Sequence, residues 1–497
     1  MEKLQVDTIE KFKNILLVVL VFTTILLLYF LWGSESLEDF IFNDNNQQYK
    51  VLSSDKVLLP DQIILGKGNE DYAVALEDKE DLWSNQILST FREFSQGTNS
   101  AVVEITEQQY KEIMKYPSII AKFQYNIPFD EFCEKYKIKK LQGYDSISNL
   151  TEIGFSKGSK GSTFIYDGNK KKYYGVVGNK PLQIFSKINT IFEQEEIATY
   201  YPLKTVLGEE SANSTLVPFE LPPAILPVDY KGDAEIGEKE NNNAMAQTYF
   251  GSTFDFVRKI EESNGTTVYM YGYGQKVLII NPNEGSIEYK EEVKSDDSEQ
   301  KSMFESLDIA LDFVGAHGEF KTIAGQEIKP YLESASPIND EENSYRFVFG
   351  FMVGKNKVFY EEKMPIIIEV VNGQVSYFRR EFINFDENQV EKRSNSEGIS
   401  AINMLAMNYE YMTEALTKAG LIDKEKSKDI SFEDMANKID NLYTGYLKPS
   451  IKISSNETSN TDKNLELTPV WVVEVNGILL YFDLYDGQPK GYSKKYQ

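Results

Sequence analysis

The only histidine of the chain, His317, lies in the stretch "VGAHGEF" (314–320), where an imidazole could serve as a general base. A hydrolase would also need a serine or cysteine nucleophile beside it, and no motif supplies one. His317 instead ends an amphipathic pattern that begins near Phe304, and Gly315 and Gly318 flank it. A cation at that position would complement the helix dipole. We therefore predict that His317 caps or packs against a helix end.

Three short motifs could carry chemistry, but none has the context that its chemistry needs. Residues 154–158 (GFSKG) match the nucleophile elbow G-x-S-x-G, yet a hairpin pattern follows where the elbow needs a helix. Ser53 and Lys56 match S-x-x-K, with only "KTI" at 321–323 resembling the downstream K-T-G strand. Residues 272–274 (GYG) lack the third glycine of a dinucleotide site. The sequence therefore predicts no catalytic, cofactor-binding or metal-binding residue, and the chain is expected not to be an enzyme.

The length, charge and cysteine content of the chain indicate how many domains to expect and which kinds of protein it does not resemble. A chain of 497 residues is expected to form about three domains. Its 77 acidic and 52 basic residues give a formal charge of -25, which repels phosphate backbones, so nucleic-acid binding is not expected. Cys133 is the only cysteine, which excludes an intramolecular disulfide and a cysteine-based zinc cluster. This usage fits an exported bacterial protein that folds without disulfides.

Residues 15–32 (ILLVVLVFTTILLLYFLW) form an uncharged apolar stretch that reaches roughly 27 Å as a helix, close to the hydrocarbon thickness of a bilayer. Lysines precede this stretch and acidic residues follow it, which places the N-terminus in the cytoplasm and the body outside the cell membrane. A buried core helix would rarely be apolar on all sides. A cleaved signal peptide usually has a shorter apolar region and small residues at its cleavage site, whereas Leu31 and Trp32 are bulky.

We therefore expect a permanent single-pass anchor over residues 15–32. Tyr29 and Trp32 lie where an interfacial aromatic belt would. Thr23 and Thr24 lie within the span and either bond a neighbouring helix or bond back to their own carbonyls, and we favour the second. The residues expected to contact the membrane or a partner helix are Ile15, Leu20, Phe22, Thr23, Thr24, Tyr29 and Trp32.

The body after the anchor reads as α+β. Helical spacing occurs over 81–94 and 106–116, and strand patterns occur over 118–128 and 161–177, the latter folding at Asp167-Gly168. The boundaries that we expect are a cytoplasmic N-terminus (1–14), the anchor (15–32), an N-terminal α+β domain (36–200), a linker (201–244), a middle α+β domain (245–388) and a C-terminal α+β domain (389–497).

The last two domains contain a repeat. Residues 365–378 (PIIIEVVNGQVSYF) and 469–482 (PVWVVEVNGILLYF) share proline, Asn-Gly and Tyr-Phe at equal spacing. Asn-Gly favours a type I′ hairpin, and proline fits a strand end or edge. Amphipathic helices are expected before each hairpin, over 304–316 and 401–416. We interpret the two domains as related repeats of a helix packed on an antiparallel sheet, against the alternative of two coincident hairpins.

The chain resembles the YycH family of membrane-anchored regulators from low-GC Gram-positive bacteria. The residues that carry this resemblance are "KFKNILLVVLVF" near the N-terminus, "AKFQYNIPFDEF" (121–132), "FIYDGNKKKYY" (164–174), "DFVGAHGEF" (312–320), "YRFVFGFMVGKNKVF" (345–359) and "EVVNGQVSYFRREF" (369–382). The His-Gly-Gly of the family reads His317-Gly318-Glu319 here. The C-terminal "TPVWVVEVNGILLYFDLYDG" (468–487) is similar to the sister YycI family and to peptidase-propeptide-like modules.

This resemblance implies a non-enzymatic regulator with one membrane helix and a three-domain extracellular body. Members act with a YycI-like regulator on a membrane sensor histidine kinase of the two-component system that governs cell-wall metabolism, with the membrane helices as the implied contact. Two alternatives stay open, an extracellular ligand- or peptide-binding module and, as the weaker one, a surface hydrolase. Homo- or hetero-dimerisation and the sign of the regulation are also open.

Overall fold

The computed structural model describes most of the body and part of the N-terminal segment. The described residues are 16–17, 20–21, 23–24, 51–75, 79–96, 101–158, 162–177, 199–208, 213–219, 225–232, 236, 238–293, 301–322, 325–338, 344–386, 398–449 and 465–496. Within them the fold is α+β with antiparallel sheets, as the sequence predicts. Among the same residues, no helix has both the length and the hydropathy that crossing a membrane requires.

The N-terminal sheet has nine strands in the order β3-β7-β6-β5-β4-β1-β2-β8-β9, and all of its ladders are antiparallel. Its strands are β1 (Gln62–Gly68), β2 (Asp71–Val74), β3 (Ala101–Ile105), β4 (Ser118–Pro128), β5 (Asn149–Ser156), β6 (Ser162–Asp167), β7 (Lys172–Val177), β8 (Thr199–Pro202) and β9 (Leu216–Pro218). The predicted strand over 118–128 is confirmed as β4, and the predicted hairpin over 161–177 as β6 and β7. Buried Asp167 holds the hairpin turn by accepting the main-chain N–H groups of Asn169 and Lys170.

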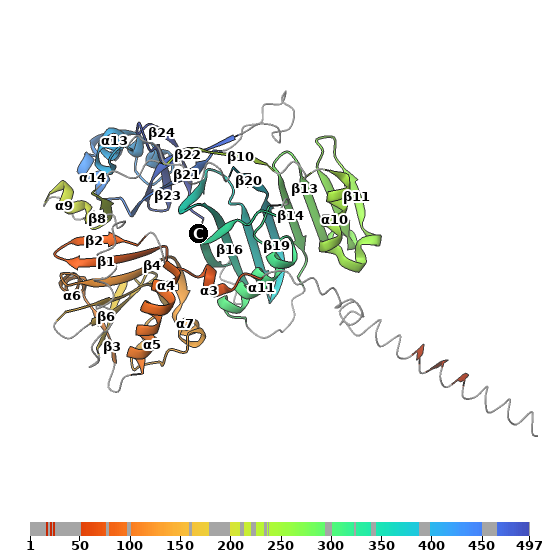
Figure 1. The fold of residues 1–497 in the computed structure, drawn as a ribbon, viewed down its shortest axis with the longest axis horizontal. Coiled ribbons are helices and arrows are strands. Elements are labelled where there is room, and N and C mark those ends of the chain that lie inside the picture. The colour runs from red at the N-terminus through yellow and green to blue at the C-terminus, as the bar shows by residue number, and fades with distance from the viewer. Residues whose placement is uncertain are drawn as a thin grey trace, which may run out of the picture.

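Helices cover both faces of the N-terminal sheet (Figure 1). The helices of the N-terminal part are α3 (Ser54–Val57), α4 (Lys79–Asp81), the π-helix η1 (Leu82–Leu88), α5 (Ser89–Ser95), α6 (Glu107–Ile113), α7 (Phe129–Lys135), η2 (Tyr144–Ser146) and α9 (Leu203–Leu207). On one face Trp83 of η1 meets Phe123 edge-on at 5.1 Å between ring centroids, and on the other Tyr110 of α6 meets Phe164 at 5.1 Å. The predicted helices over 81–94 and 106–116 are therefore confirmed, the second starting from a capping box of Thr106 and Gln109.

The second sheet, called here the long sheet, has fifteen strands and runs through both the middle and the C-terminal parts. Its strands are β10 (Val228–Gly232), β11 (Arg258–Glu261), β12 (Thr267–Tyr271), β13 (Lys276–Asn281), β14 (Ser286–Glu291), β15 (Lys329–Pro337), β16 (Ser344–Val353), β17 (Asn356–Tyr360), β18 (Ile366–Val371), β19 (Gln374–Glu381), β20 (Ile383–Phe385), β21 (Asn441–Lys448), β22 (Leu465–Val475), β23 (Ile478–Asp483) and β24 (Pro489–Lys494). The two parts join where β17 pairs with β21 in parallel. The middle and C-terminal parts are thus joined edge to edge.

Each part of the long sheet carries a long amphipathic helix. The helices of this region are α10 (Lys239–Phe250), η3 (Gly251–Phe256), η4 (Gly272–Gly274), α11 (Met303–Ala316), α13 (Ala401–Lys418), η5 (Lys426–Asp429) and α14 (Phe432–Ala436). α11 packs on β16, β18 and β19, and α13 packs on β23 and β24. The predicted helices over 304–316 and 401–416 are confirmed, each with a serine N-cap, Ser302 and Ser400.

The two Asn-Gly hairpins have the predicted type I′ geometry. Asn372 and Gly373 have φ of 50° and 75°, and Asn476 and Gly477 have φ of 47° and 75°. The expectation that proline lies at a strand end or edge holds for Pro365 but is wrong for Pro469, which lies inside β22. The ladder explains this position, because β22 pairs with β10 before Pro469 and with β23 after it. Proline therefore occupies the point where β22 changes partners and needs no ladder N–H there.

Residues 201–244, predicted to be a linker, contain α9, β9, β10 and the start of α10. In this segment Asn213 donates to the carbonyls of Ala436 and Ile439 at 2.7 and 2.8 Å, which ties the N-terminal sheet to the C-terminal part. β10 pairs with both β20 and β22. The segment therefore adds strands to both sheets.

Candidate functional site

The nucleophile motifs form ordinary local structure. Ser156 lies at the end of β5, is buried, and donates from Oγ to the Ile113 carbonyl at 2.8 Å. A hairpin follows it, as the sequence predicts, so Ser156 lacks the exposed hydroxyl and the helix of a nucleophile elbow. Ser53 caps α3 and accepts the Asp55 N–H, and its motif partner Lys56 is exposed. Tyr273 stands fully exposed in the β12–β13 connection.

His317 is the C-cap of α11, so the prediction of capping and packing is confirmed. Its Nδ1 lies 2.7 Å from the Phe313 carbonyl, and its ring stacks on Phe313 and Tyr249 with centroids 4.0 and 4.2 Å away. Burial lowers the pKa of His317 to about 4, although bonds to the Phe313 and Thr248 carbonyls oppose that shift. The expectation of a cation at this position is therefore wrong, because the imidazole is neutral at pH 7. Gly315 also lies within the last turn of the helix, and Gly318, with φ of 104°, makes the turn that ends it.

The cation that complements the α11 dipole is Arg380 of β19. Its side chain is 1% exposed, and its guanidinium donates to the carbonyls of His317 and Gly318 at 3.3 Å and to that of Lys321. Burial lowers its pKa to about 10, so Arg380 remains charged at pH 7. The histidine of this motif is therefore part of a helix end held by a buried arginine.

The predicted anchor residues fall largely outside the described residues. Ile15, Phe22, Tyr29 and Trp32 are not described, whereas Leu20, Thr23 and Thr24 lie in helical backbone. The hydroxyls of Thr23 and Thr24 donate to the Leu20 carbonyl at 3.0 and 2.7 Å, which confirms that they bond back to their own helix. Leu20 is 60% exposed.

The described residues contain no group of three or more His, Cys, Asp or Glu side chains that could hold a metal ion. Cys133 is buried on α7, and burial raises the pKa of its thiol to about 12. A thiol with that pKa is protonated at neutral pH and is a poor nucleophile.

Charged side chains gather instead where the N-terminal sheet, the middle part and the C-terminal part meet, a region called here the junction cluster. Its members are Asp61, Lys79, Gln124, Tyr331, Glu333, Lys357, Tyr443, Glu474 and Lys495. The side chains of Asp61 and Lys357 are only 6% and 17% exposed. Figure 1 shows the C-terminus between the two sheets, beside β21 and β23.

Lys357 of β17 is the centre of the junction cluster. Its Nζ donates to Asp61 Oδ1 and, at 3.0 Å, to Gln124 Oε1, so one ammonium joins the middle part to two segments of the N-terminal sheet. The same Nζ lies 4.6 Å from the ring centroid of Tyr331 and 5.9 Å from that of Tyr443. Three regions of the chain thus meet around a single lysine.

Gln124 and Lys79 extend this network. The Gln124 amide donates to Glu333 Oε2 at 3.1 Å and to the Leu332 carbonyl at 2.8 Å, which links β4 to β15. Lys79 donates to the main-chain carbonyl of Asp61 at 2.6 Å. The two Gln124 bonds therefore join the N-terminal and middle parts, whereas the Lys79 bond lies within the N-terminal part.

The C-terminal side of the cluster is a second ion pair. Lys495 donates to Glu474 Oε1 at 2.8 Å, and Asn441 and Tyr443 donate to Glu474 Oε2 at 3.0 and 3.4 Å. These groups fix the chain end after β24 against β21 and β22. Tyr443 connects this pair to Lys357 through its ring.

Burial and charge pairing compete in the cluster. Burial alone would raise the pKa of Asp61, but Lys357 and Lys79 outweigh it and hold that pKa at about 2. For Glu333 burial prevails over the attraction of Lys357 and Lys495, so its pKa is raised. Lys495 shows a raised pKa because Glu474 and Glu333 outweigh its burial. The charges of the cluster therefore depend on one another. Removal of one cation would leave a buried carboxylate without the partner that offsets its desolvation, and this would destabilise the folded state.

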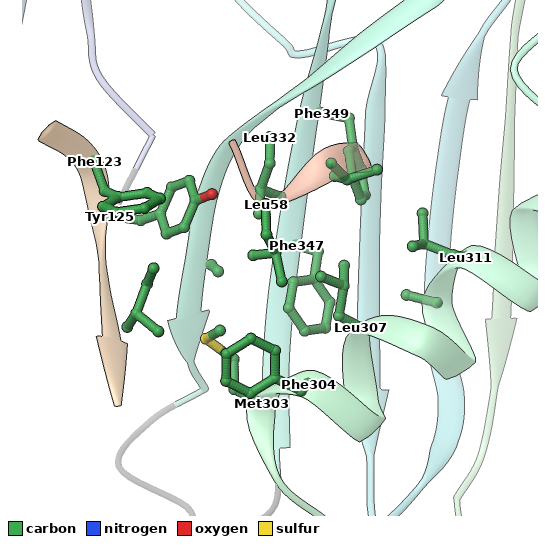
Figure 2. Packing of buried hydrophobic residues seen from close by; sticks show 14 of the residues in the cluster. Leu58, Phe123, Tyr125, Met303, Phe304, Leu307, Leu311, Leu332, Phe347 and Phe349 are labelled. Atoms are coloured by element: carbon green, nitrogen blue, oxygen red, sulfur yellow. The ribbon is translucent and has the colours of Figure 1, made fainter. Parts of the chain in front are cut away.

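An apolar contact reinforces the junction. Figure 2 shows Leu58 of the α3 segment packed among Leu307, Leu332 and Phe349 of the middle part. Next to it, Glu131 of α7 accepts the Met303 N–H at 2.7 Å, so a carboxylate of the N-terminal part caps α11. Phe304 also meets Tyr136 edge-on at 6.2 Å. The hydrophobic cores of the two parts are thus continuous.

The junction cluster was not predicted from the sequence. Asp61 lies hundreds of residues before Glu333 and Lys357, and the three belong to no local motif, so each resembles an ordinary solvated charge. A weak local signal exists at Lys357, which stands in the apolar strand "NKVFY". Chemically, the cluster offers buried ion pairs that hold three parts of the body in one arrangement.

One solved structure and one family model are similar to this chain. The crystal structure of YycH from Bacillus subtilis aligns with 87% of this chain and 98% of its own chain, with a TM-score of 0.53 and 12% sequence identity. The protein thus has the fold of that extended α+β structure. Residues 10–172 match the YycH protein N-terminal domain. This chain therefore contains a segment similar to the N-terminal domain of the YycH family, within a body that has the YycH fold.

Two further solved structures show weaker similarity. An uncharacterized protein from Eubacterium rectale ATCC 33656 aligns with 54% of this chain and 85% of its own, at 11% identity and a TM-score of 0.30. The C-terminal domain of Bacillus megaterium YpeB aligns with 52% of this chain and 98% of its own, at 10% identity and a TM-score of 0.25. No curated protein matches the sequence.

Proposed function

We propose that this chain is a non-enzymatic regulator, tethered to the cell membrane by residues 15–32, that modulates a sensor histidine kinase of a cell-wall two-component system. The observation that carries the proposal is the match of residues 10–172 to the YycH N-terminal domain, because that range includes the apolar stretch as well as most of the N-terminal sheet. The YycH family is a regulatory family. A YycI-like regulator is the expected second partner.

The charge pattern around the apolar stretch supports a single-pass orientation. Lys3, Lys11 and Lys13 precede residues 15–32, and Glu35, Glu38, Asp39 and Asp44 follow them. Such a lysine bias retains the N-terminus in the cytoplasm and exports the body. The body is then an extracellular unit, in which the junction cluster keeps the parts in a fixed arrangement.

The composition of the stretch indicates how it would contact a kinase helix. Because Thr23 and Thr24 bond back to the Leu20 carbonyl, they offer no free hydroxyl proton to a neighbour. The described apolar side chains Leu16, Leu17, Leu20 and Val21 are each at least half exposed. A contact of this kind is made by shape-matched packing of apolar side chains. It regulates only if the anchor binds one signalling state of the kinase better than the other.

The test is kinase activity in a reconstituted bilayer. The full chain and the sensor kinase encoded by the same genome are placed together in nanodiscs, with and without the YycI-like regulator, and the autophosphorylation rate is measured. We expect the full chain to change that rate by several-fold. Coupling between two sites typically changes an affinity by roughly 5–150-fold, and an effect of several-fold lies near the low end of that range. A variant with residues 15–32 replaced by an unrelated apolar helix of equal length should lose the effect.

A matched control separates the anchor from the body. Thr23→Val with Thr24→Val keeps the length and side-chain shape of the span, makes it slightly more apolar, and removes only hydroxyls that bond back to the helix, so it should regulate as the unchanged chain does. If the full chain leaves the autophosphorylation rate unchanged, with and without the second regulator, the proposed function is wrong. If the helix exchange regulates normally, the contact lies in the body and the anchor mechanism is wrong.

A further inference from the structure

Strand β11 (Arg258–Glu261) is an exposed edge at the outer end of the long sheet. It stands first in the strand order and, among the described residues, pairs only with β12 (Figure 1). Arg258, Ile260 and Glu261 are exposed. An unpaired edge offers a row of main-chain donors and acceptors to another strand.

The hairpin geometry shows which groups this edge presents. The Glu262 N–H donates to the Thr266 carbonyl at 2.8 Å, so Glu262 is hydrogen-bonded toward β12. Because the ladder alternates, the main-chain groups of Ile260 also point toward β12, while those of Lys259 and Glu261 point outward. An incoming strand would therefore bond to Lys259 and Glu261.

The charges along this edge are self-complementary. Residues 258–262 read RKIEE, two cations and two anions on either side of Ile260. In an antiparallel pair centred on Ile260, Arg258 faces Glu262 of the second copy and Lys259 faces Glu261 of the second copy, and the reverse also holds. A shift of two residues would oppose two glutamates or two lysines, and a parallel pair would oppose like charges throughout. Opposite charges favour only the centred antiparallel register.

That register also satisfies the main chain. Lys259 of one copy and Glu261 of the other become a hydrogen-bonded pair, in which each residue donates its main-chain N–H to the carbonyl of the other. The two-fold symmetry produces this pair twice. Within one chain, Lys259 and Glu261 already form an ion pair at 2.9 Å. Pairing would join two such ion pairs into a network of four charges on one face of the sheet.

The opposite face of the sheet adds apolar area. α10 covers the face that carries Lys259, whose Nζ lies 3.4 Å from Asn243. On the other face Ile260 stands opposite Val268, and Val268 stands opposite Ile279. Ile260 is 38% exposed, and the other two are partly exposed. Pairing at Ile260 would join this row to the same row of the second copy.

We propose that two copies of this chain dimerise by antiparallel pairing of their β11 edges, centred on Ile260. The proposal is independent of the proposed function, since it rests on the charge, hydrogen-bond direction and apolar row of one strand. It makes the long sheets of two molecules continuous across a two-fold axis.

Charge reversal tests the proposal on the full chain in detergent micelles, with oligomeric state measured by analytical ultracentrifugation. Glu261→Lys with Glu262→Lys, and separately Arg258→Glu with Lys259→Glu, each oppose like charges in the centred register. Each variant should dimerise at least about ten-fold more weakly than the unchanged chain. A mixture of the two variants restores every opposite-charge pair and should recover the dimer. Glu104→Lys with Glu107→Lys, around the end of β3, makes the same charge change elsewhere and should leave the dimer intact.

A cysteine pair reports the register directly. Facing residues of a pair that lacks main-chain bonds lie roughly 4.5 Å apart at Cα, within the range of a disulfide. Ile260→Cys should therefore form a covalent dimer under mild oxidation, because the native Cys133 is buried. Val103→Cys, on β3 and 46% exposed in the unchanged chain, should not. The proposal is overturned if the unchanged chain is monomeric at all concentrations, if the reversed variants dimerise normally, if their mixture fails to associate, or if both cysteine variants cross-link equally.

Discussion

Replacing Lys357 by methionine tests whether the junction cluster holds the body together. Methionine keeps most of the side-chain volume and removes the charge, so Asp61 is left as a buried carboxylate, 6% exposed, with Lys79 and the weaker contribution of Lys495 as its remaining cations. Breaking a buried pair from one side costs about 3–5 kcal/mol. The lowered pKa of Asp61, about 2 against 3.8, corresponds to about 2 kcal/mol of stabilisation of the charged form. We therefore expect a loss of about 3 kcal/mol in the free energy of unfolding.

The assay is urea unfolding of the full chain in detergent at pH 7, followed by tryptophan fluorescence, since Trp83 and Trp471 report on the N-terminal and C-terminal cores. The double variant Asp61→Asn with Lys357→Met removes both charges and should be more stable than Lys357→Met alone. The matched control is Lys363→Met, whose side chain is 51% exposed, with an expected change within about 0.5 kcal/mol.

The pH dependence of this pair has a definite sign. The folded pKa of Asp61 is lowered, so its contribution is fully present above pH 4 and is lost as the pH falls toward about 2. The deficit of Lys357→Met should accordingly shrink over that window. If Lys357→Met unfolds no more easily than Lys363→Met at pH 7, the cluster does not stabilise the body and our reasoning is refuted.

Three further predictions concern single positions. The sole imidazole resonance in an NMR titration should report a pKa for His317 near 4. Because this folded pKa is lowered, the neutral imidazole should contribute about 1–3 kcal/mol to the free energy of unfolding above pH 6.5, and this contribution should be lost as the pH falls toward 4. A measured pKa above 6 would contradict the packing. Arg380→Met leaves the three carbonyls at the end of α11 without the arginine donor and should lower the free energy of unfolding, measured in urea, by about 3 kcal/mol. An unchanged free energy of unfolding would show that Arg380 does not stabilise this helix end. Gly477→Ala forces alanine to a φ of 75° and should cost about 1 kcal/mol in thermal unfolding, and a neutral result would argue against the type I′ turn.

Local signals in the sequence predicted much of the secondary structure. Asn372-Gly373 and Asn476-Gly477 fix their turns because both residues take positive φ at low cost. Each hairpin can therefore be predicted from a single dipeptide. Ser302 begins α11 through a capping box that is equally local. Such elements depend on neighbours a few residues away and need no knowledge of the fold.

Features that depend on distant residues were beyond such reasoning. The parallel pairing of β17 with β21 joins the middle and C-terminal parts into one sheet, and no sequence pattern marks which strands will meet. The same holds for Lys357 and Asp61, which meet only because two sheets pack together. The error at His317 has this origin too, because the pKa of the imidazole depends on Tyr249 and Arg380 from other elements.

The most direct test of the account is the mass and location of the mature chain in its native cell. We predict a membrane-bound protein whose intact mass includes residues 1–33 and whose body is open to protease added outside the cell. A mature protein that begins after Gly33 and is recovered free in the medium would contradict it, because no helix would remain to reach a kinase within the bilayer.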